Sequence, residues 1–150
     1  MKVTLCVLCD RATVREGLLH ILGAGIARLG RPVLPAPMGV DLGLMLVPGE
    51  LGEVQGVHQV QVVIRDESSS EVALARVGMD FGEVSELPSP PPNIPLSIPL
   101  QNVGLSSYGI YTLSVEYDDH SVNDMLFVVE KEIAPGATAM LPADAESLRP

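Results

Sequence analysis

Several residue types that mark particular functions are scarce in this sequence of 150 residues. It has no tryptophan, two phenylalanines and three tyrosines, so few side chains are available for nucleic-acid bases to stack on. Lysine and arginine number nine against nineteen aspartates and glutamates, and the formal net charge is −10. Basic contacts supply most of the affinity for phosphate and for anionic lipid surfaces. We therefore expect no nucleic-acid partner and no membrane partner.

Long apolar segments are also lacking. No stretch has the roughly 20 consecutive apolar residues that a membrane-spanning helix needs. A short apolar run follows Lys2, but Asp10 and Arg11 interrupt it and no small-residue cleavage site comes after it. An export signal is therefore not predicted. We expect a cytoplasmic protein, or a virion component if the chain is encoded by a phage.

The two cysteines, Cys6 and Cys9, have the Cys-x-x-Cys spacing of redox and zinc sites. They lie in a run that has the composition of a β-strand, where residues three apart are separated by about 10 Å. A disulfide bridges Cα atoms no more than about 7 Å apart, and an odd separation directs the two thiols to opposite faces. The spacing therefore indicates two small buried residues and not a redox centre.

The sequence is rich in short segments that alternate apolar and polar residues, such as Val60-Gln61-Val62 and the segment from Tyr111 to Tyr117. A period of two places one face of a segment in a core and the other in water, which is typical of antiparallel β-sheet. Proline, glycine, serine and acidic residues separate these segments and predict about eight strands. The expected strands cover residues 2–9, 17–29, 40–47, 58–65, 72–82, 96–100, 108–117 and 122–130.

Four local features add to this prediction. Residues 10–16 are expected to form a charged loop. The segment Gly23-Ala24-Gly25 indicates a bulge or a close backbone approach. In the fifth strand the apolar residues change parity, which predicts a bulge near Arg76. Residues 83–95 are rich in proline and cannot form a central strand, so they are expected to cross between two sheets.

The predicted fold class is all-β: a two-sheet antiparallel β-sandwich of about eight strands, immunoglobulin-like or alternatively a jelly roll. Residues 1–133 are expected to form a single domain. Residues 134–150 are rich in alanine and proline and show no period, so we expect a flexible tail there.

Three short motifs resemble a known family. They are Leu8-Cys9-Asp10, the segment from Gly17 to Gly23, and the closing hairpin that begins at Gly109-Ile110-Tyr111. Together they are similar to a family of small uncharacterised bacterial proteins. The resemblance covers about residues 2–130 and implies an immunoglobulin-like β-sandwich. It assigns no functional residue.

Motifs of catalytic and cofactor sites are missing from the sequence, including the phosphate-binding loop, the nucleophile elbow and the zinc-protease helix. The segment from Asp118 to Ser121 holds residue types used by hydrolases, but neighbouring side chains in a turn diverge, and turn chemistry explains the same residues. His20 and His58 are expected on strand faces without metal-ligand spacing. We therefore expect no enzymatic activity, no cofactor and no metal.

The order of the strands predicts where the acidic loops lie. If the strands alternate in direction, the connections after the first, third, fifth and seventh strands share one end of the molecule, and both chain termini lie at the other. The end that holds these four connections is a possible docking site for a basic partner, although acidic loops also serve solubility. A calcium site is disfavoured because no Asp-x-Asp-x-Asp loop occurs. The residues of this possible docking end are Asp10, Glu16, Glu50, Glu53, Glu83, Glu86, Asp118 and Asp119.

The function that best fits these features is a non-enzymatic protein–protein interaction module whose partner is another protein, possibly basic. One alternative is self-assembly as a structural subunit of a phage particle or another large assembly. A second alternative is a carrier that holds a small ligand between its sheets. Both alternatives rest on analogy with other β-sandwiches.

Overall fold

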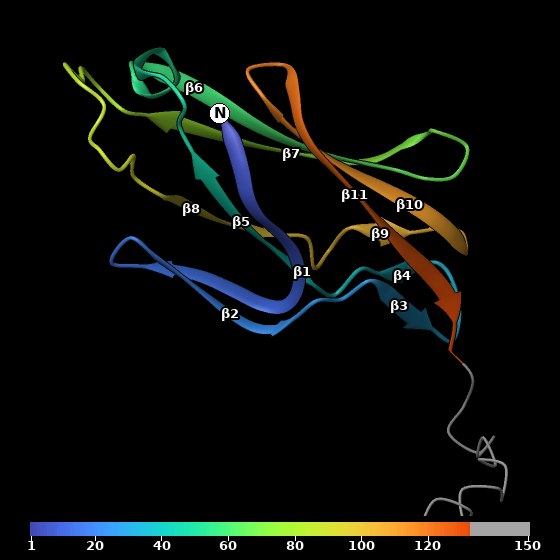
Figure 1. Cartoon of the computed structure of the whole chain (residues 1–150). Helices are drawn as coiled ribbons and strands as arrows, with labels where there is room; N and C mark the ends of the chain where they lie inside the picture. The colour runs from blue at the N-terminus through green and yellow to red at the C-terminus, as the bar shows by residue number, and fades with distance from the viewer. Residues whose placement is uncertain (133–150) are drawn as a thin grey trace, which may run out of the picture.

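The computed structural model describes residues 1–132, which form an all-β protein, as the sequence predicts (Figure 1). The predicted tail, residues 134–150, lies outside the described residues. Within residues 1–132 no helix is both long enough and apolar enough to cross a membrane. The elements are β1 (Lys2–Arg15), β2 (Leu18–Ala24), β3 (Arg28–Arg31), β4 (Ala36–Pro37), β5 (Asp41–Val47), the 3₁₀ helix η1 (Leu51–Val54), β6 (Val57–Arg65), β7 (Glu71–Asp80), β8 (Ile94–Pro99), β9 (Gly104–Leu105), β10 (Gly109–Tyr117) and β11 (His120–Lys131).

These strands pair into two larger sheets and one small one. The four-stranded sheet has the order β2-β1-β5-β8, the five-stranded sheet has the order β3-β11-β10-β6-β7, and β4 pairs with β9. Compared with the eight strands expected, β3, β4 and β9 are additional and short. The long strands β6, β7, β10 and β11 agree closely with the predicted segments.

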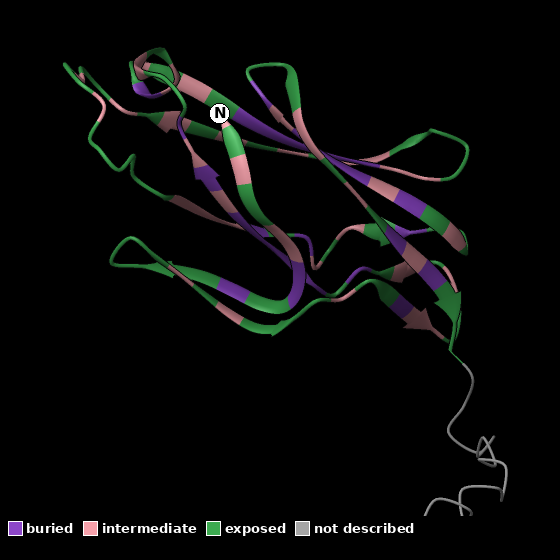
Figure 2. Ribbon diagram, in the orientation of Figure 1, coloured by how far each residue is buried: buried purple, intermediate pink, exposed green. Residues whose placement is uncertain are grey.

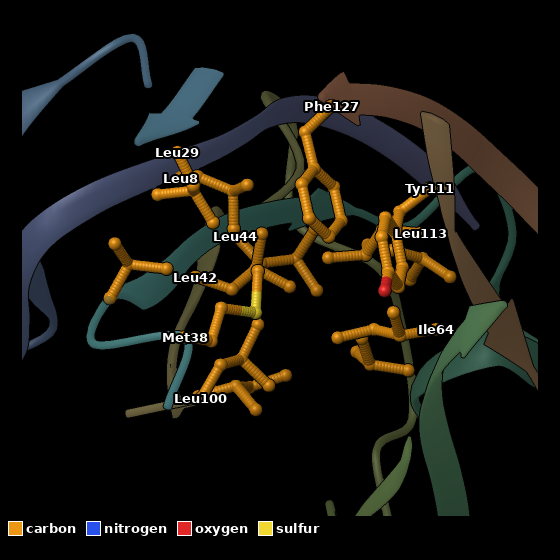
Figure 3. Packing of buried hydrophobic residues seen from close by; sticks show 14 of the residues in the cluster. Leu8, Leu29, Met38, Leu42, Leu44, Ile64, Leu100, Tyr111, Leu113 and Phe127 are labelled. Atoms are coloured by element: carbon orange, nitrogen blue, oxygen red, sulfur yellow. The ribbon is translucent and has the colours of Figure 1, made fainter. Parts of the chain in front are cut away.

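One hydrophobic core lies between the two larger sheets. The alternating residues of β5 contribute Leu42, Leu44 and Leu46, which are fully buried. The five-stranded sheet contributes Tyr111 and Phe127, whose rings stack with centroids 5.3 Å apart (Figure 3). Figure 2 shows buried residues along the strands of both sheets, whereas the β1–β2 turn is exposed. Burying each large apolar side chain contributes about 1.5–3 kcal/mol, so this shared core holds the sheets together.

The loop predicted over residues 10–16 is wrong, because β1 continues to Arg15 and pairs with β2. Arg11 lies opposite Leu22 and Arg15 opposite Leu18, which leaves Glu16 and Gly17 as the turn. The charged residues of this segment do not end the strand, because the hairpin turns one face to solvent. Arginine is tolerated there.

The strand predicted over residues 17–29 is two strands in different sheets. β2 ends at Ala24, and β3 begins at Arg28 and pairs with β11 in parallel. The fold is therefore not entirely antiparallel, contrary to the prediction. The expected close approach is confirmed at Gly23, which has a φ of +65° and where a Cβ would collide with the Asp10 carboxylate. The backbone angle favours glycine there, and a side chain would also displace the exposed Asp10 carboxylate.

The bulge predicted near Arg76 is also wrong. Ala73 and Ala75 face the core with the same parity as Val77, so the strand runs regularly through Arg76. The register shifts instead between Ile64 and Arg65, opposite the start of β7. Because alanine is only weakly hydrophobic, Ala73 and Ala75 do not mark the buried face of this strand in the sequence.

The β1–β2 hairpin covers the outer face of β5 and β8, on the side away from the five-stranded sheet (Figure 1). Gly43 faces outward between two core leucines, and a Cβ there would lie 3.0 Å from the Cδ1 atom of Ile21. Ser97 of β8 donates a hydrogen bond of 2.6 Å from its hydroxyl to the carbonyl of Ala12. β5 is therefore packed on both faces.

Replacing Glu16 by asparagine is expected to stabilise the fold by about 0.5 kcal/mol. Glu16 and Gly17 have φ angles of +52° and +73°, the geometry of a two-residue turn that favours Asn-Gly. Urea unfolding measures the change. Glu16→Gln is the matched control, since it removes the same charge without favouring positive φ. An equal gain in both variants would assign the effect to charge.

Replacing Gly43 by valine is expected to destabilise the fold by about 1–3 kcal/mol, because the added methyl groups push the hairpin off β5. Gly78→Val is the matched control, since nothing lies within 4 Å of a Cβ at Gly78 in β7. Chemical unfolding of both variants gives the comparison. Equal losses would contradict close packing of the hairpin on β5.

Candidate functional site

Three connections of the chain are bound to one another at one end of the molecule, at the top of Figure 1. They are residues 48–56 between β5 and β6, residues 81–93 between β7 and β8, and the Asp118-Asp119 turn. The amide of Gly56 donates to the carbonyl of Gly82 at 2.9 Å. The hydroxyl of Tyr117 donates to the carbonyl of Glu53. The loops therefore form one surface, held by backbone hydrogen bonds and by the Tyr117 side chain.

This surface is acidic. We call it the acidic end and define it by Glu50, Glu53, Glu83, Glu86, Asp118 and Asp119. Its three connections contain no lysine and no arginine. Strand alternation assigns eight acidic residues to one end of the molecule. Six of them lie on these neighbouring loops.

Asp10 and Glu16 do not belong to the acidic end. β1 runs antiparallel to β5, so Lys2 lies beside Val47 where β5 ends, and Cys9 lies beside Asp41 where β5 begins. Asp10 is therefore at the start of β5, and Glu16 is in the turn of the β1–β2 hairpin. The same pairing brings Met1 to the acidic end, where its amino group contacts the Glu53 carboxylate. The chain start is thus not at the opposite end, as alternation predicts, because β1 and β5 are neighbours in one sheet.

A pocket of about 360 Å³ opens within the acidic end. Its walls include Glu50, Glu53, His58, Tyr117, Asp118 and His120. Such a volume is within the range of small-molecule sites, at its lower limit. Its carboxylates are those of Glu50, Glu53 and Asp118, and the Met1 amino group, which contacts Glu53, also lies on its wall.

His58 is the central side chain of this pocket. Its Nδ1 atom lies 2.6 Å from Oδ2 of Asp118, and its Nε2 atom lies 3.1 Å from the carbonyl oxygen of Gln55. The ring stacks on Tyr117 with centroids 5.3 Å apart. Both nitrogens face acceptors, so both are satisfied when the ring is protonated. In this geometry neither nitrogen is free to take a proton from a nucleophile.

The environment also shifts the acid–base properties of Asp118 and Tyr117. Partial burial by itself would raise the pKa of Asp118, but hydrogen bonds from His58 and the Gln59 amide, with the charges of His58 and His120, lower it overall. Burial, together with the nearby charge of Asp118, raises the pKa of Tyr117 to about 12. Near neutral pH the carboxylate is therefore ionised and the phenol is protonated.

The cysteines lie apart from this site and do not bond to each other. Both are free thiols, as the spacing predicts. Burial raises the pKa of Cys6 to about 11 and also raises the pKa of Cys9. A protonated thiol is a poor nucleophile and a poor metal ligand. Among the residues that the structure describes, no three histidine, cysteine, aspartate or glutamate side chains gather as a metal site.

The sequence analysis does not identify two candidate functional residues, His58 and Asp41. His58 was expected merely on a strand face, although it shares the parity of the core residues Val60 and Val62 and so points inward at the strand's end. Asp41 is buried, with 3% of its surface exposed. The available signal was its position as the single charged residue in the apolar run from Val40 to Val47.

Comparison with known proteins adds a family without a known activity. The model of a family of unknown function, DUF6941, matches residues 4–130, and the chain belongs to this family. The predicted resemblance to an uncharacterised family is thereby confirmed, whereas its bacterial origin stays a prediction. A search of curated proteins finds no match.

Asp118→Asn is expected to lower the free energy of unfolding by about 1 kcal/mol at neutral pH, since two hydrogen bonds to a carboxylate are weakened. The side chain is 42% exposed, so solvent screens its ionic part. Because the pKa of Asp118 is lowered from 3.8 by folding, its stabilisation is present above that value and is lost as pH falls below it.

Urea unfolding at neutral pH and near pH 3 tests this dependence. The difference between the wild type and Asp118→Asn should shrink in acid. The exposed residue Asp124 supplies the control Asp124→Asn, for which a smaller and more constant difference is expected. A difference for Asp118→Asn that does not change with pH would contradict the lowered pKa of Asp118.

Proposed function

We propose that this member of the family is a non-enzymatic protein–protein interaction module that binds a basic segment of another protein at its acidic end. The observation that carries the proposal is that hydrogen bonds join the acidic connections 48–56 and 81–93 and tie the first of them to Tyr117, beside the Asp118-Asp119 turn. A pocket lined by Glu50, Glu53 and Asp118 lies at this surface. A surface held in this way presents its charges without first ordering its loops, which reduces the entropy lost on binding.

The distribution of charge supports a basic partner. Arginines lie elsewhere on the protein: Arg28 pairs with Glu130 at 2.8 Å, and Arg31 donates to backbone carbonyls near β4. Arg11 and Arg15 are on the β1–β2 hairpin. Glu50, Glu83 and Glu86 form no salt bridge among the described residues. Such exposed carboxylates attract a positive segment over a Debye length and speed its association.

The chemistry of the pocket supports a binding role over catalysis. His58 has acceptors at both ring nitrogens, Tyr117 keeps its proton, and the thiols have raised pKa values. A general base within reach of a nucleophile is the usual requirement of hydrolytic sites. The exposed carboxylates of the acidic end, such as that of Glu50, match instead the charge of a lysine or arginine side chain.

The finer assignments of fold and location belong to the same proposal. We propose an immunoglobulin-like β-sandwich, with a jelly roll as the alternative, because the two larger sheets share one core. We place the protein in the cytoplasm of a bacterium, or in a virion if it is phage-encoded. Filling of the core by side chains gives no support to ligand carriage between the sheets (Figure 3).

Calorimetric titration of the full chain with octalysine tests whether the acidic end binds a basic segment. Binding is expected at low salt and should weaken steadily as salt is added. The triple variant Glu50→Gln, Glu83→Gln, Glu86→Gln should weaken binding about tenfold, because each exposed charge contributes about 0.5 kcal/mol.

A second triple variant with the same change in net charge provides the control. Glu67→Gln, Glu71→Gln and Asp124→Asn change exposed residues outside the acidic end. This variant should bind within about twofold of the wild type, since separate surface charges interact weakly. Equal weakening by both triples would show an effect of net charge alone, and no binding at low salt would overturn the basic-partner proposal.

A further inference from the structure

Asp41 is an acidic residue in an unusual position. It begins β5, is 97% buried, and is not part of the acidic end. Its Oδ2 atom accepts a hydrogen bond of 3.0 Å from the amide of Ala12, and its Oδ1 atom accepts one of 3.1 Å from the side-chain amide of Gln101. Within residues 1–132 no lysine, arginine or histidine forms a salt bridge with it.

The carboxylate lines a pocket of about 600 Å³ on the outer face of the four-stranded sheet. This pocket exists because Asp41 has the outward parity of Gly43, and because β1 curves over β5 and β8 after Cys9. Its volume lies in the middle of the range for small-molecule sites. The polar residues that line it are Arg11, Thr13, Asp41, Ser97, Gln101 and Asn102.

A buried carboxylate without a cation is energetically unfavourable. An ionised carboxylate has about four acceptor positions, and two neutral donors occupy two of them. Buried charges are otherwise found paired or bound to a metal ion, because desolvation costs several kcal/mol per ion. The remaining acceptor capacity of Asp41 is therefore suited to a positive group that enters from the pocket.

Arg11 supplies the opposite charge on the wall of the same pocket. Its side chain is exposed and forms no salt bridge among the described residues, with Asp41 or with any other carboxylate. A guanidinium presents paired N–H donors that match the two oxygens of a carboxylate. The pocket thus holds one buried negative group and one free positive group, with neutral hydrogen-bonding residues beside them.

We propose that this pocket binds a small zwitterion, a free amino acid or a dipeptide, with its ammonium group on Asp41 and its carboxylate on Arg11. A ligand with both charges satisfies Asp41 and neutralises Arg11 at the same time. The site is separate from the acidic end, since Asp41 and Val47 are opposite ends of β5. Binding there does not depend on the docking function proposed above.

Nuclear magnetic resonance of the full chain labelled with ¹⁵N tests this assignment. The probes are a panel of free amino acids and dipeptides, with methylamine and acetate as the two half-ligands. At least one zwitterion should bind about tenfold or more tightly than either half, as expected when a second charge-assisted contact contributes about 1.4 kcal/mol. The amide signals of Ala12 and Asn102 should shift on binding.

Variants separate the two charged anchors from general effects. Arg11→Gln is expected to remove the advantage of the zwitterion over methylamine and to leave the fold intact, since the side chain is exposed. Arg15→Gln, on the same strand and outside the pocket, should bind like the wild type. Asp41→Asn should abolish ammonium binding, and its folding is checked by the spectrum of the free protein.

Three results would overturn the proposal. They are the absence of binding by every probe, equal binding of methylamine and the zwitterions, and signal shifts confined to the acidic end. Octalysine titration of Arg11→Gln keeps the two sites distinguishable, since loss of the zwitterion site should leave octalysine binding unchanged.

Discussion

The packing of β5 on both of its faces is the constraint on which the rest of the structure depends. On one face its leucines complete the core shared by the two larger sheets. On the other face Gly43 admits Ile21, so the β1–β2 hairpin closes over the strand. A side chain at Gly43 would separate these layers. Both candidate sites are defined by this arrangement, because β5 starts at the buried Asp41 and leads into the acidic loop of residues 48–56.

Each end of β5 therefore has its own electrostatic character. Beyond Val47, where β5 ends, the acidic loops carry exposed carboxylates. Their interactions with a partner act over distance and are screened by salt. At the start of β5, the single carboxylate of Asp41 is withdrawn from water and accepts two hydrogen bonds, of 3.0 and 3.1 Å. The first environment suits rapid and modest attraction of a basic surface. The second suits recognition of one small group of defined charge.

His58 and Asp118 link the fold to the acidic end. The turn at Asp118-Asp119 has positive φ at both residues, and its carboxylates bind back to β6 through His58, the Gln59 amide and Gln61. Two aspartates adopt a turn with two positive φ angles less readily than Asn-Gly does. Side-chain contacts to the neighbouring strand therefore stabilise this turn. These contacts also leave both ring nitrogens of His58 facing hydrogen-bond acceptors.

The sequence by itself determined the all-β class, most of the strands of the second half, the absence of a disulfide between Cys6 and Cys9, and the close approach at Gly23. All of these depend on local spacing or on the parity of side chains. Only the tertiary structure decided which strands are neighbours, and this separated Asp10 and Glu16 from the acidic end. Residues 10–15 were misread because charges on a solvated strand face look like a loop. Asp41 was overlooked because its burial comes from β1 crossing β5, a contact between distant segments. The one local indication was its place as the single charged residue in the apolar run from Val40 to Val47.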